Sequence, residues 1–158
     1  MTALNDWWAS QTAGPVAAYG AEGVGKTWAV MHWVVDRIND LPIVLALPSS
    51  SLPAITGINE ASVIDFLANE LFGLTNTQTL PYWDKRLRRL LARPKVEGPV
   101  LLLVLDGLNQ ESTFEWQRLL QVLQGGIFTD KVRVVLTMQS HFLEDKRNRP
   151  VKAILLEQ

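Results

Sequence analysis

Short apolar runs alternate along this chain with longer stretches in which apolar residues recur every three or four positions. The short runs have no regular polar interruption, which is typical of strands that are covered on both faces. Because amphipathic stretches separate them, they predict an α/β protein with a parallel sheet. The segments expected to form strands are Val16–Tyr19, Ile43–Leu47, Val100–Leu105, Val132–Thr137 and Ala153–Leu156.

The amphipathic stretches predict four helices, and a helix in this setting packs one apolar stripe on the sheet. The predicted helices are Gly25–Asn39, Glu60–Phe72, Tyr82–Ala92 and Thr113–Leu123. The side chains expected to face the sheet from the first of them are Val30, Trp33, Val34 and Ile38. Trp28 lies on the same helix and is expected to belong to the core.

Capping residues and loop composition mark the boundaries between these elements. Asn59 or Ser62 is a suitable cap for the second helix, and Gly73 is expected to end it. Two segments, Pro48–Pro53 and Leu74–Leu80, are expected to be mobile loops. The first of these follows a strand directly, and α/β proteins bind ligands in the loops that follow strands.

Composition and charge narrow the class of protein. The 158 residues suit one domain. A hydrophobic content of 47% argues against disorder, and the formal net charge of −1 argues against a generally basic nucleic-acid binder. The chain has no cysteine, which excludes disulfides and thiolate metal sites. It has no apolar run long enough for a membrane span and no signal-peptide pattern at its start, so we expect a cytoplasmic protein.

An eight-residue motif between the first predicted strand and the first predicted helix carries the candidate chemistry. It matches the phosphate-binding loop pattern G-x-x-x-x-G-K-[ST] and consists of Gly20, Ala21, Glu22, Gly23, Val24, Gly25, Lys26 and Thr27. Glycines let successive N–H groups turn inward around a phosphate, and the helix N-terminus adds positive potential. We expect Lys26 to contact the β- and γ-phosphates and Thr27 to bind Mg²⁺. The alternative is a glycine-rich turn with a solvated lysine.

A second element supplies a carboxylate for the same cation. The apolar run Val100–Leu105 ends in Asp106, and Mg²⁺ prefers carboxylate, hydroxyl and water oxygens. A P-loop protein places such an aspartate at the end of a neighbouring strand. The predicted metal ligands are therefore Thr27 and Asp106, and the predicted cofactors are ATP or ADP with Mg²⁺.

The segment Leu105-Asp106-Gly107-Leu108-Asn109, together with the loop motif, resembles the signal-transduction ATPases of the STAND class and their NACHT relatives. The resemblance covers about residues 8–137. It implies a three-layer P-loop core whose five parallel strands have the order 5-1-4-3-2, with helices on both faces. It further implies a nucleotide-operated switch that exchanges ADP for ATP, associates with other copies and controls an effector through other domains of a longer chain.

The sequence departs from that class at three places, which bear on the predicted catalytic residues Lys26, Asp106, Gln110, Glu111 and Gln139. Gln110 aligns with the glutamate that polarises water, and Glu111 lies one residue late; an amide orients water but is no general base. Gln139 stands where relatives carry arginine, which stabilises charge better. The chain also stops at Gln158, so we expect residues 1–158 to be the core of a larger multidomain protein.

The resulting prediction is an ATP- or ADP-binding regulatory switch with weak, slow or partner-dependent Mg²⁺-dependent ATPase activity. The alternatives are a small-molecule kinase, a non-hydrolysing nucleotide-binding interaction module and a guanine-nucleotide switch, although the Asn-Lys-x-Asp motif of familiar GTPases is missing. No membrane partner is expected, and nucleic acid is not favoured.

Three further features keep two interpretations each. The basic stretch 85–95 is either a solvated helix face or a partner surface, and no aromatic stacking platform accompanies it. Trp7 and Trp8 either pack at the edge of the core or help to contain an adenine ring. Arg147 and Arg149 belong either to a solvated turn or to an arginine finger.

Overall fold

A parallel sheet with the order β2-β3-β4-β1-β5 forms the centre of the computed structural model, which describes residues 2–10, 14–21 and 25–157. Four strands of five to eight residues make up most of it: β1 (Val16–Gly20), β2 (Ile43–Pro48), β3 (Leu101–Asp106) and β4 (Val132–Gln139). The fifth, β5 (Leu156–Glu157), has two residues and pairs with Val16 and Ala17. The parallel α/β arrangement is as predicted, and so is the order of the four longer strands.

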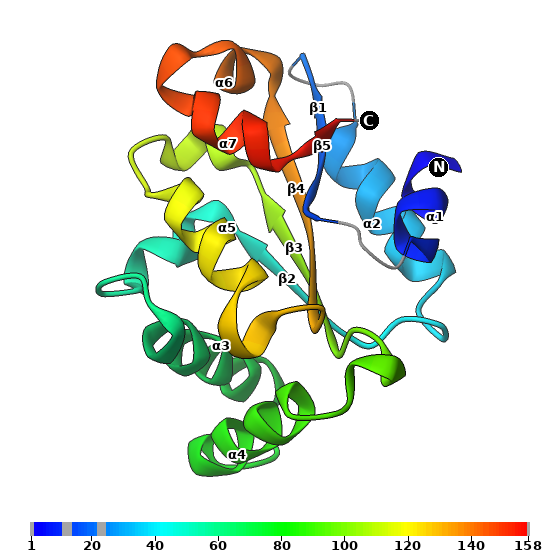
Figure 1. Cartoon of the computed structure of the whole chain (residues 1–158), viewed down its shortest axis with the longest axis vertical. Helices are drawn as coiled ribbons and strands as arrows, with labels where there is room; N and C mark the ends of the chain where they lie inside the picture. Colours follow the sequence, from blue (N-terminus) through cyan, green and yellow to red (C-terminus); the bar gives the residue numbers. More distant parts are fainter. Residues whose placement is uncertain (1, 11–13, 22–24, 158) are drawn as a thin grey trace.

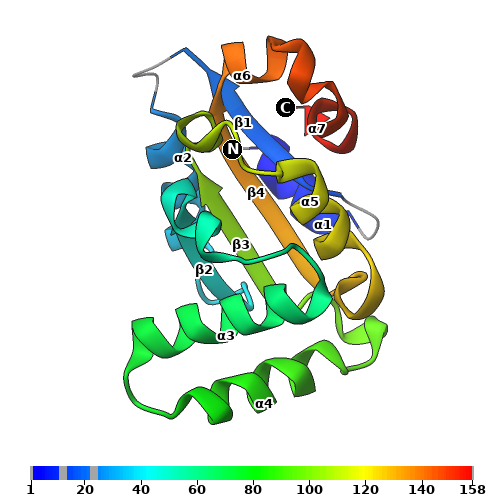
Figure 2. The ribbon, with the colours of Figure 1, turned by 90° about the vertical axis from the view of Figure 1, so that its left-hand side faces the viewer.

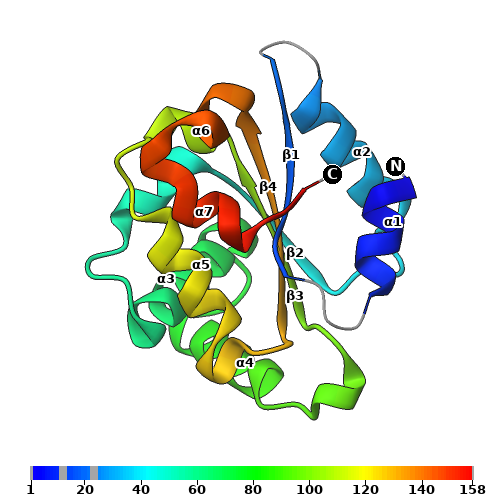
Figure 3. The ribbon, with the colours of Figure 1, turned by 45° about the horizontal axis from the view of Figure 1, so that its top comes forward.

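Helices cover both faces of the sheet, as Figures 1 and 3 show. On one face lie α1 (Thr2–Ala9) and α2 (Lys26–Asp36). The other face carries α3 (Glu60–Thr75), α5 (Trp116–Gln124), α6 (Ser140–Glu144) and α7 (Arg149–Ile154). The remaining long helix, α4 (Leu80–Leu91), packs against α3 at the end of the molecule away from α6 (Figure 2). Among the described residues, no helix has the length and apolar character needed to cross a bilayer.

The apolar strand β3 shows why this fold follows from the sequence. Leu101, Leu103 and Leu105 belong to the core on the α3 and α5 side, whereas Leu102 and Val104 belong to the core beneath α1 and α2. All five are at most 2% exposed, because successive strand side chains point to opposite faces and both faces are covered. The unbroken apolar run therefore reports a central strand.

The first predicted helix is shorter than expected, and one side of it is open. Val30, Trp33 and Val34 are buried on the sheet as predicted. Ile38, expected to face the sheet, is 53% exposed, and Trp28, expected in the core, is 70% exposed. Ile38 lies past the end of α2, whose last residue is Asp36. Trp28 lies on the side of the helix opposite the buried Val30, where its ring stacks on that of the exposed His32. The prediction for Ile38 is wrong because the helix ends before it, and the prediction for Trp28 is wrong because its side chain lies away from the sheet.

The boundaries of α3 combine one confirmed and one incorrect prediction. The side chain of Asn59 accepts a hydrogen bond from the Ser62 amide at 2.9 Å, and the Ser62 hydroxyl accepts one from the Asn59 amide at 3.0 Å. This reciprocal pair is a capping box. The helix passes through Gly73 rather than stopping there and ends at Asn76, whose left-handed φ of 50° closes it.

The loop after β2, expected to be mobile, is a 3₁₀ helix over Ser49–Ala54. Leu52 packs in the core and is 2% exposed, while the hydroxyl of Ser51 donates to the Pro48 carbonyl at 2.8 Å. The buried Leu52 fixes the segment to the core. The prediction of a mobile loop, which rested on the Pro and Ser content alone, is therefore wrong. The second expected loop is shortened, since α3 continues to Thr75.

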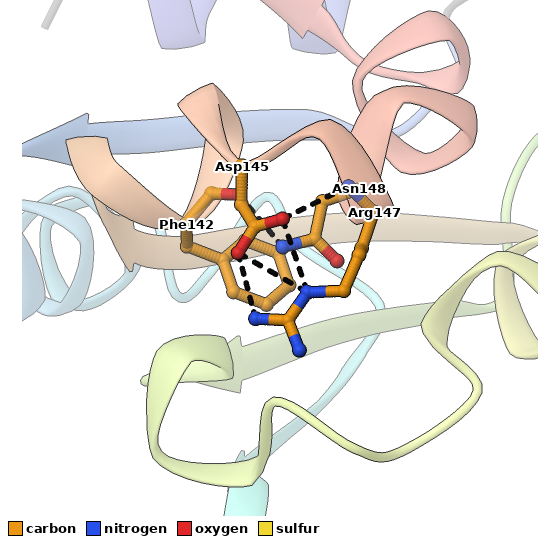
Figure 4. A network of polar contacts seen from close by, with 4 residues as sticks. All are labelled: Phe142, Asp145, Arg147 and Asn148. Atoms are coloured by element: carbon orange, nitrogen blue, oxygen red, sulfur yellow. Dashed lines mark hydrogen bonds and ion pairs between the residues drawn. The ribbon is translucent and has the colours of Figure 1, made fainter.

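The C-terminal part differs most from the prediction. Residues 153 and 154, expected in a strand, belong to α7, and only Leu156–Glu157 pair with β1. Pro150 favours the start of this helix, and Val151 packs in the core. The preceding turn is held by Asp145, which accepts hydrogen bonds from Arg147 at 2.8–3.3 Å, and by Asn148, which donates to the Phe142 carbonyl at 2.8 Å (Figure 4).

The N-terminal helix α1, which the sequence pattern did not predict, is fixed to the sheet by a buried arginine. Arg133 of β4 donates to the carbonyls of Trp7 and Ser10 and lies 5.6 Å from the ring centroids of Trp7 and Trp8. Trp7 is buried and donates to the Gly14 carbonyl at 2.7 Å. Burial lowers the pKa of Arg133, whose charge is compensated by main-chain carbonyls and aromatic faces.

Candidate phosphate and magnesium site

The carboxyl ends of three strands bring the predicted site residues to one edge of the sheet. In the parallel register, Gly20 of β1 lies beside Gln139 of β4, and Leu105 of β3 lies beside Leu136 of β4. Asp106 and Thr137, which follow Leu105 and Leu136, therefore stand at neighbouring strand ends. The helix α2 also begins at this edge, directly after Gly25.

The loop motif is described at both of its ends. Gly20 closes β1, Ala21 follows it, and Gly25 precedes α2, whereas Glu22, Gly23 and Val24 lie outside the described residues. Gly25 has a φ of 79°, in the left-handed region that side chains disfavour. A Cβ there would meet nothing within 4 Å, so the requirement for glycine is conformational rather than steric.

Lys26 folds back toward the start of the loop. Its Nζ donates to the Ala21 carbonyl at 2.8 Å and lies 3.4 Å from the Gly20 carbonyl. The side chain is half-buried. The ammonium group is therefore held close to the loop backbone by carbonyl groups, which are weaker partners for it than phosphate oxygens.

Thr27 and Asp106 meet across the edge. The Thr27 hydroxyl donates to Oδ1 of Asp106 at 2.6 Å, although 79 residues separate them in the chain. Both predicted metal ligands thus lie at one point, and their oxygens form the donor set that Mg²⁺ prefers. Their role as metal ligands stays a prediction.

Thr137 completes the cluster and was not among the predicted site residues. Its hydroxyl donates to the same Oδ1 of Asp106 and accepts from the Gly107 amide at 2.9 Å. Thr137 is 2% exposed. A polar residue at the end of an otherwise apolar strand was the signal that could have identified it, because a buried hydroxyl needs a hydrogen-bond partner.

Two other predicted catalytic residues, Gln110 and Glu111, lie on the turn that follows Asp106 and Gly107. Gln110 is exposed on the short 3₁₀ turn Leu108–Glu111, and its amide lies over Gly107, where a Cβ would be 3.3 Å from it. The Glu111 carbonyl accepts from the Trp116 ring nitrogen at 2.9 Å. Within the described residues, no hydrogen bond joins either side chain to Thr27 or Asp106.

Gln139 is tied to the same turn through its main chain. Its amide donates to Oδ1 of Asn109 at 3.1 Å, which connects the end of β4 to the segment that follows Asp106. Gly107, with a φ of 77°, lets the chain turn between Asp106 and the 3₁₀ turn that contains Asn109. Asn109 is a positioning residue that sequence reasoning noted only as part of a motif.

No protein-family profile matches the chain, and no curated protein matches it. Among solved structures, a chain in the structure of Drosophila ORC bound to DNA has a similar fold, with a TM-score of 0.55 and 16% sequence identity. The similarity covers 99% of this chain and 39% of that one, so this chain spans about two-fifths of the matched chain. At this identity, the similarity establishes the α/β fold alone.

Proposed function

We propose that this chain binds ATP or ADP with Mg²⁺ at the carboxyl edge of its sheet and acts as a STAND-type nucleotide-dependent switch. The observation that supports this most strongly is the 2.6 Å hydrogen bond between Thr27 and Asp106. A chance match to the loop motif does not require an aspartate from another strand beside its threonine. The fold similarity to the ORC chain also supports a P-loop-like arrangement of sheet and helices.

Each residue of the site has a distinct part in the proposed binding. The loop amides and the N-terminus of α2 surround the phosphates, and Lys26 leaves its carbonyl partners to neutralise the β- and γ-phosphate oxygens. Thr27 and Asp106 provide oxygens for Mg²⁺, directly or through water. The bound cation would neutralise charge on the phosphate oxygens. Thr137 positions Asp106 by donating to it.

Slow hydrolysis follows from the residues available to activate water. Gln110 can orient a water molecule but cannot accept its proton, and Gln139 brings no charge to the transferred phosphoryl group. A glutamate at position 110 would accept the proton, and an arginine at position 139 would bring the charge. We therefore expect hydrolysis to be weak unless a partner supplies the missing groups, and a non-hydrolysing binding module is the second candidate.

The kinase alternative has less support. A lid over the phosphates needs cationic side chains that are free to close, whereas Arg147 is bound to Asp145 in its own turn at 2.8 Å. Incubation with ATP and a panel of metabolites would detect phosphoryl transfer, and competition with GTP would test the guanine-nucleotide alternative.

The test is calorimetric titration of ATP and ADP with and without Mg²⁺. We expect both nucleotides to bind and Mg²⁺ to tighten ATP binding. Asp106→Asn should abolish this Mg²⁺ effect while leaving metal-free ADP binding in place. Lys146→Ala, which removes an exposed lysine far along the chain from the motif, is the matched control. A folded protein that gives no heat with either nucleotide would contradict the proposal.

A further inference from the structure

The segment 80–95, which comprises α4 and the turn after it, concentrates positive charge in a chain that is otherwise acidic. It holds six cations against one carboxylate, Asp84, whereas the rest of the sequence holds nine cations against fifteen carboxylates. The cations are Lys85, Arg86, Arg88, Arg89, Arg93 and Lys95. A net charge near zero for the whole protein therefore conceals a strong local asymmetry.

The helix sorts these charges onto its outer side. Leu87, Leu90 and Leu91 are each at most 5% exposed and form the side that packs inward, together with the half-buried Trp83. All six cations are exposed. Since 3.6 residues make a turn, the positions between the leucines face away from α3, and the basic side chains form one continuous outward face.

Most of this charge is not neutralised within the protein. Arg88 pairs with Asp84 at 3.1 Å, and Lys95 with Asp130 at 3.7 Å. Lys85, Arg86, Arg89 and Arg93 have no ion pair with any acid in the described part of the chain. Lys85, Arg86 and Arg89 on the outer side of α4, with Arg93 just past its end, repel one another, and a bound polyanion would relieve that repulsion.

The helix is also held firmly in place. Thr79 caps its start by accepting from the Tyr82 amide at 3.3 Å, and its length packs on α3. The buried Lys131, at the start of β4, donates to the Arg93 carbonyl just past its end. Figure 2 shows α4 along the outer border of the molecule, at the opposite end of the strands from α6 and the carboxyl end of β1. The basic face is therefore separate from the candidate phosphate loop.

The composition of this face favours a phosphate backbone over an acidic protein surface as its anionic partner. Protein interfaces usually have apolar or aromatic anchors at their centre, with lysine depleted. Here all three leucines are turned inward, and the exposed ring of Tyr82 lies at one end. Contacts to a phosphate backbone need only cationic donors, and arginine, which supplies four of the six cations, can donate two hydrogen bonds to one phosphate.

We propose that the outer face of α4 binds the phosphodiester backbone of double-stranded nucleic acid without reading its sequence. The proposal does not depend on nucleotide binding at the loop, because the two surfaces share no residue. Four unpaired cations predict weak binding, within the range of about 10⁻⁴ to 10⁻⁶ M that is typical of non-specific binding.

The experiment is fluorescence anisotropy with a labelled 20-base-pair DNA duplex and the RNA duplex of the same sequence, across a salt series. Neutralising four phosphates predicts a slope of log Kobs against log salt of about −3.6, which is roughly a 150-fold loss of affinity between 50 and 200 mM salt. The double variant R86Q/R89Q should lower this slope to about −1.8. Binding of either duplex, or of both, supports the proposal, and a comparison of the two affinities shows whether DNA or RNA is the preferred partner.

The control is K146Q/R149Q, which removes two exposed cations elsewhere and should leave the slope unchanged. Circular dichroism and thermal melting would show that both double variants are folded, and Lys26→Ala should bind the duplexes as the parent protein does. The proposal is overturned if neither duplex binds in a salt-dependent manner, or if both double variants lose affinity equally. It is also overturned if polyglutamate binds through α4 more tightly than the duplexes do.

Discussion

The hydroxyl of Thr137 donates to the same Asp106 oxygen that accepts from Thr27, so one carboxylate joins the end of β4 to the start of α2. Only one of these hydroxyls is buried, and it also accepts from the Gly107 amide at 2.9 Å. Thr137 thus acts on the site through Asp106 rather than by touching a ligand.

Replacing Thr137 with valine keeps its shape and removes this hydroxyl. The Gly107 amide keeps the Thr137 carbonyl at 3.1 Å and Asp106 keeps Thr27, so losing the buried hydroxyl should cost about 1 kcal/mol of unfolding free energy. Urea denaturation measures this loss. Thr137→Ser retains the hydroxyl and should recover most of the stability; a larger loss in Thr137→Ser than in Thr137→Val would mean that the methyl group matters more than the hydroxyl.

Replacing Lys26 with alanine should remove nucleotide binding and leave the fold intact, because its ammonium group contacts two carbonyls at the edge of the loop and, among the residues that the structure describes, no carboxylate. Thermal melting with ADP or ATP checks this. At a 100-fold excess over Kd, ligand linkage stabilises the parent protein by about 2.7 kcal/mol. The variant should melt at the same temperature with and without nucleotide.

Replacing Gln110 with glutamate should raise the rate of ATP hydrolysis, by about tenfold or more, since a carboxylate can accept the proton of attacking water. The exposed position of Gln110 allows the change without loss of stability. Phosphate release under single-turnover conditions measures the rate, with Gln110→Asn as the control that keeps an amide. No acceleration would indicate that the turn after Asp106 does not face the phosphates.

Replacing Arg133 with methionine should loosen α1. The guanidinium bonds to two carbonyls at the end of that helix, and losing charged hydrogen bonds at a buried site should cost about 3 kcal/mol. Urea denaturation and limited proteolysis near residues 2–10 measure the effect. The exposed Arg149→Met is the matched control, and a similar loss there would argue against a specific anchor.

The Asp145–Arg147 pair sets a pH dependence in the C-terminal turn. Hydrogen bonds from Arg147 lower the pKa of Asp145 to about 2. A carboxylate with a lowered pKa in the folded state stabilises the turn above its unfolded pKa of about 3.9 and loses this contribution as the pH falls toward 2. An NMR titration of the Asp145 side chain should give a midpoint near 2, and Arg147→Ala should return it toward the unfolded value.

The central strands and the candidate site could be predicted because their signals are local and strong. The run from Leu101 to Leu105 needs both faces covered, and Asp106 follows it at the edge where the loop motif must also lie. The parts that were missed depend on tertiary neighbours. Nothing in the sequence near Ile38 shows that α2 ends before it, at Asp36, and Arg133 stabilises α1 from more than 120 residues away.

Two further errors concern the type of a short element and the point at which a helix ends. The apolar residues at 153–156 fit a strand or a helix equally well, and the decision rests on Pro150 at the start of α7 and on Val151 in the core. Gly73 was treated as a stop, although α3 gains enough from burying Leu67 and Leu71 to continue past it.

The strand order has a consequence for biosynthesis. β1 precedes the other strands described here, yet its long neighbour in the sheet is β4, which begins at Val132. Until β4 has been synthesised, β1 has no long partner strand. The cluster of Thr27, Asp106 and Thr137 is also incomplete at that stage. Parallel pairings of such wide sequence separation form slowly. The nascent chain must therefore tolerate this delay, and under the proposed function nucleotide could assist folding only after β4 has formed.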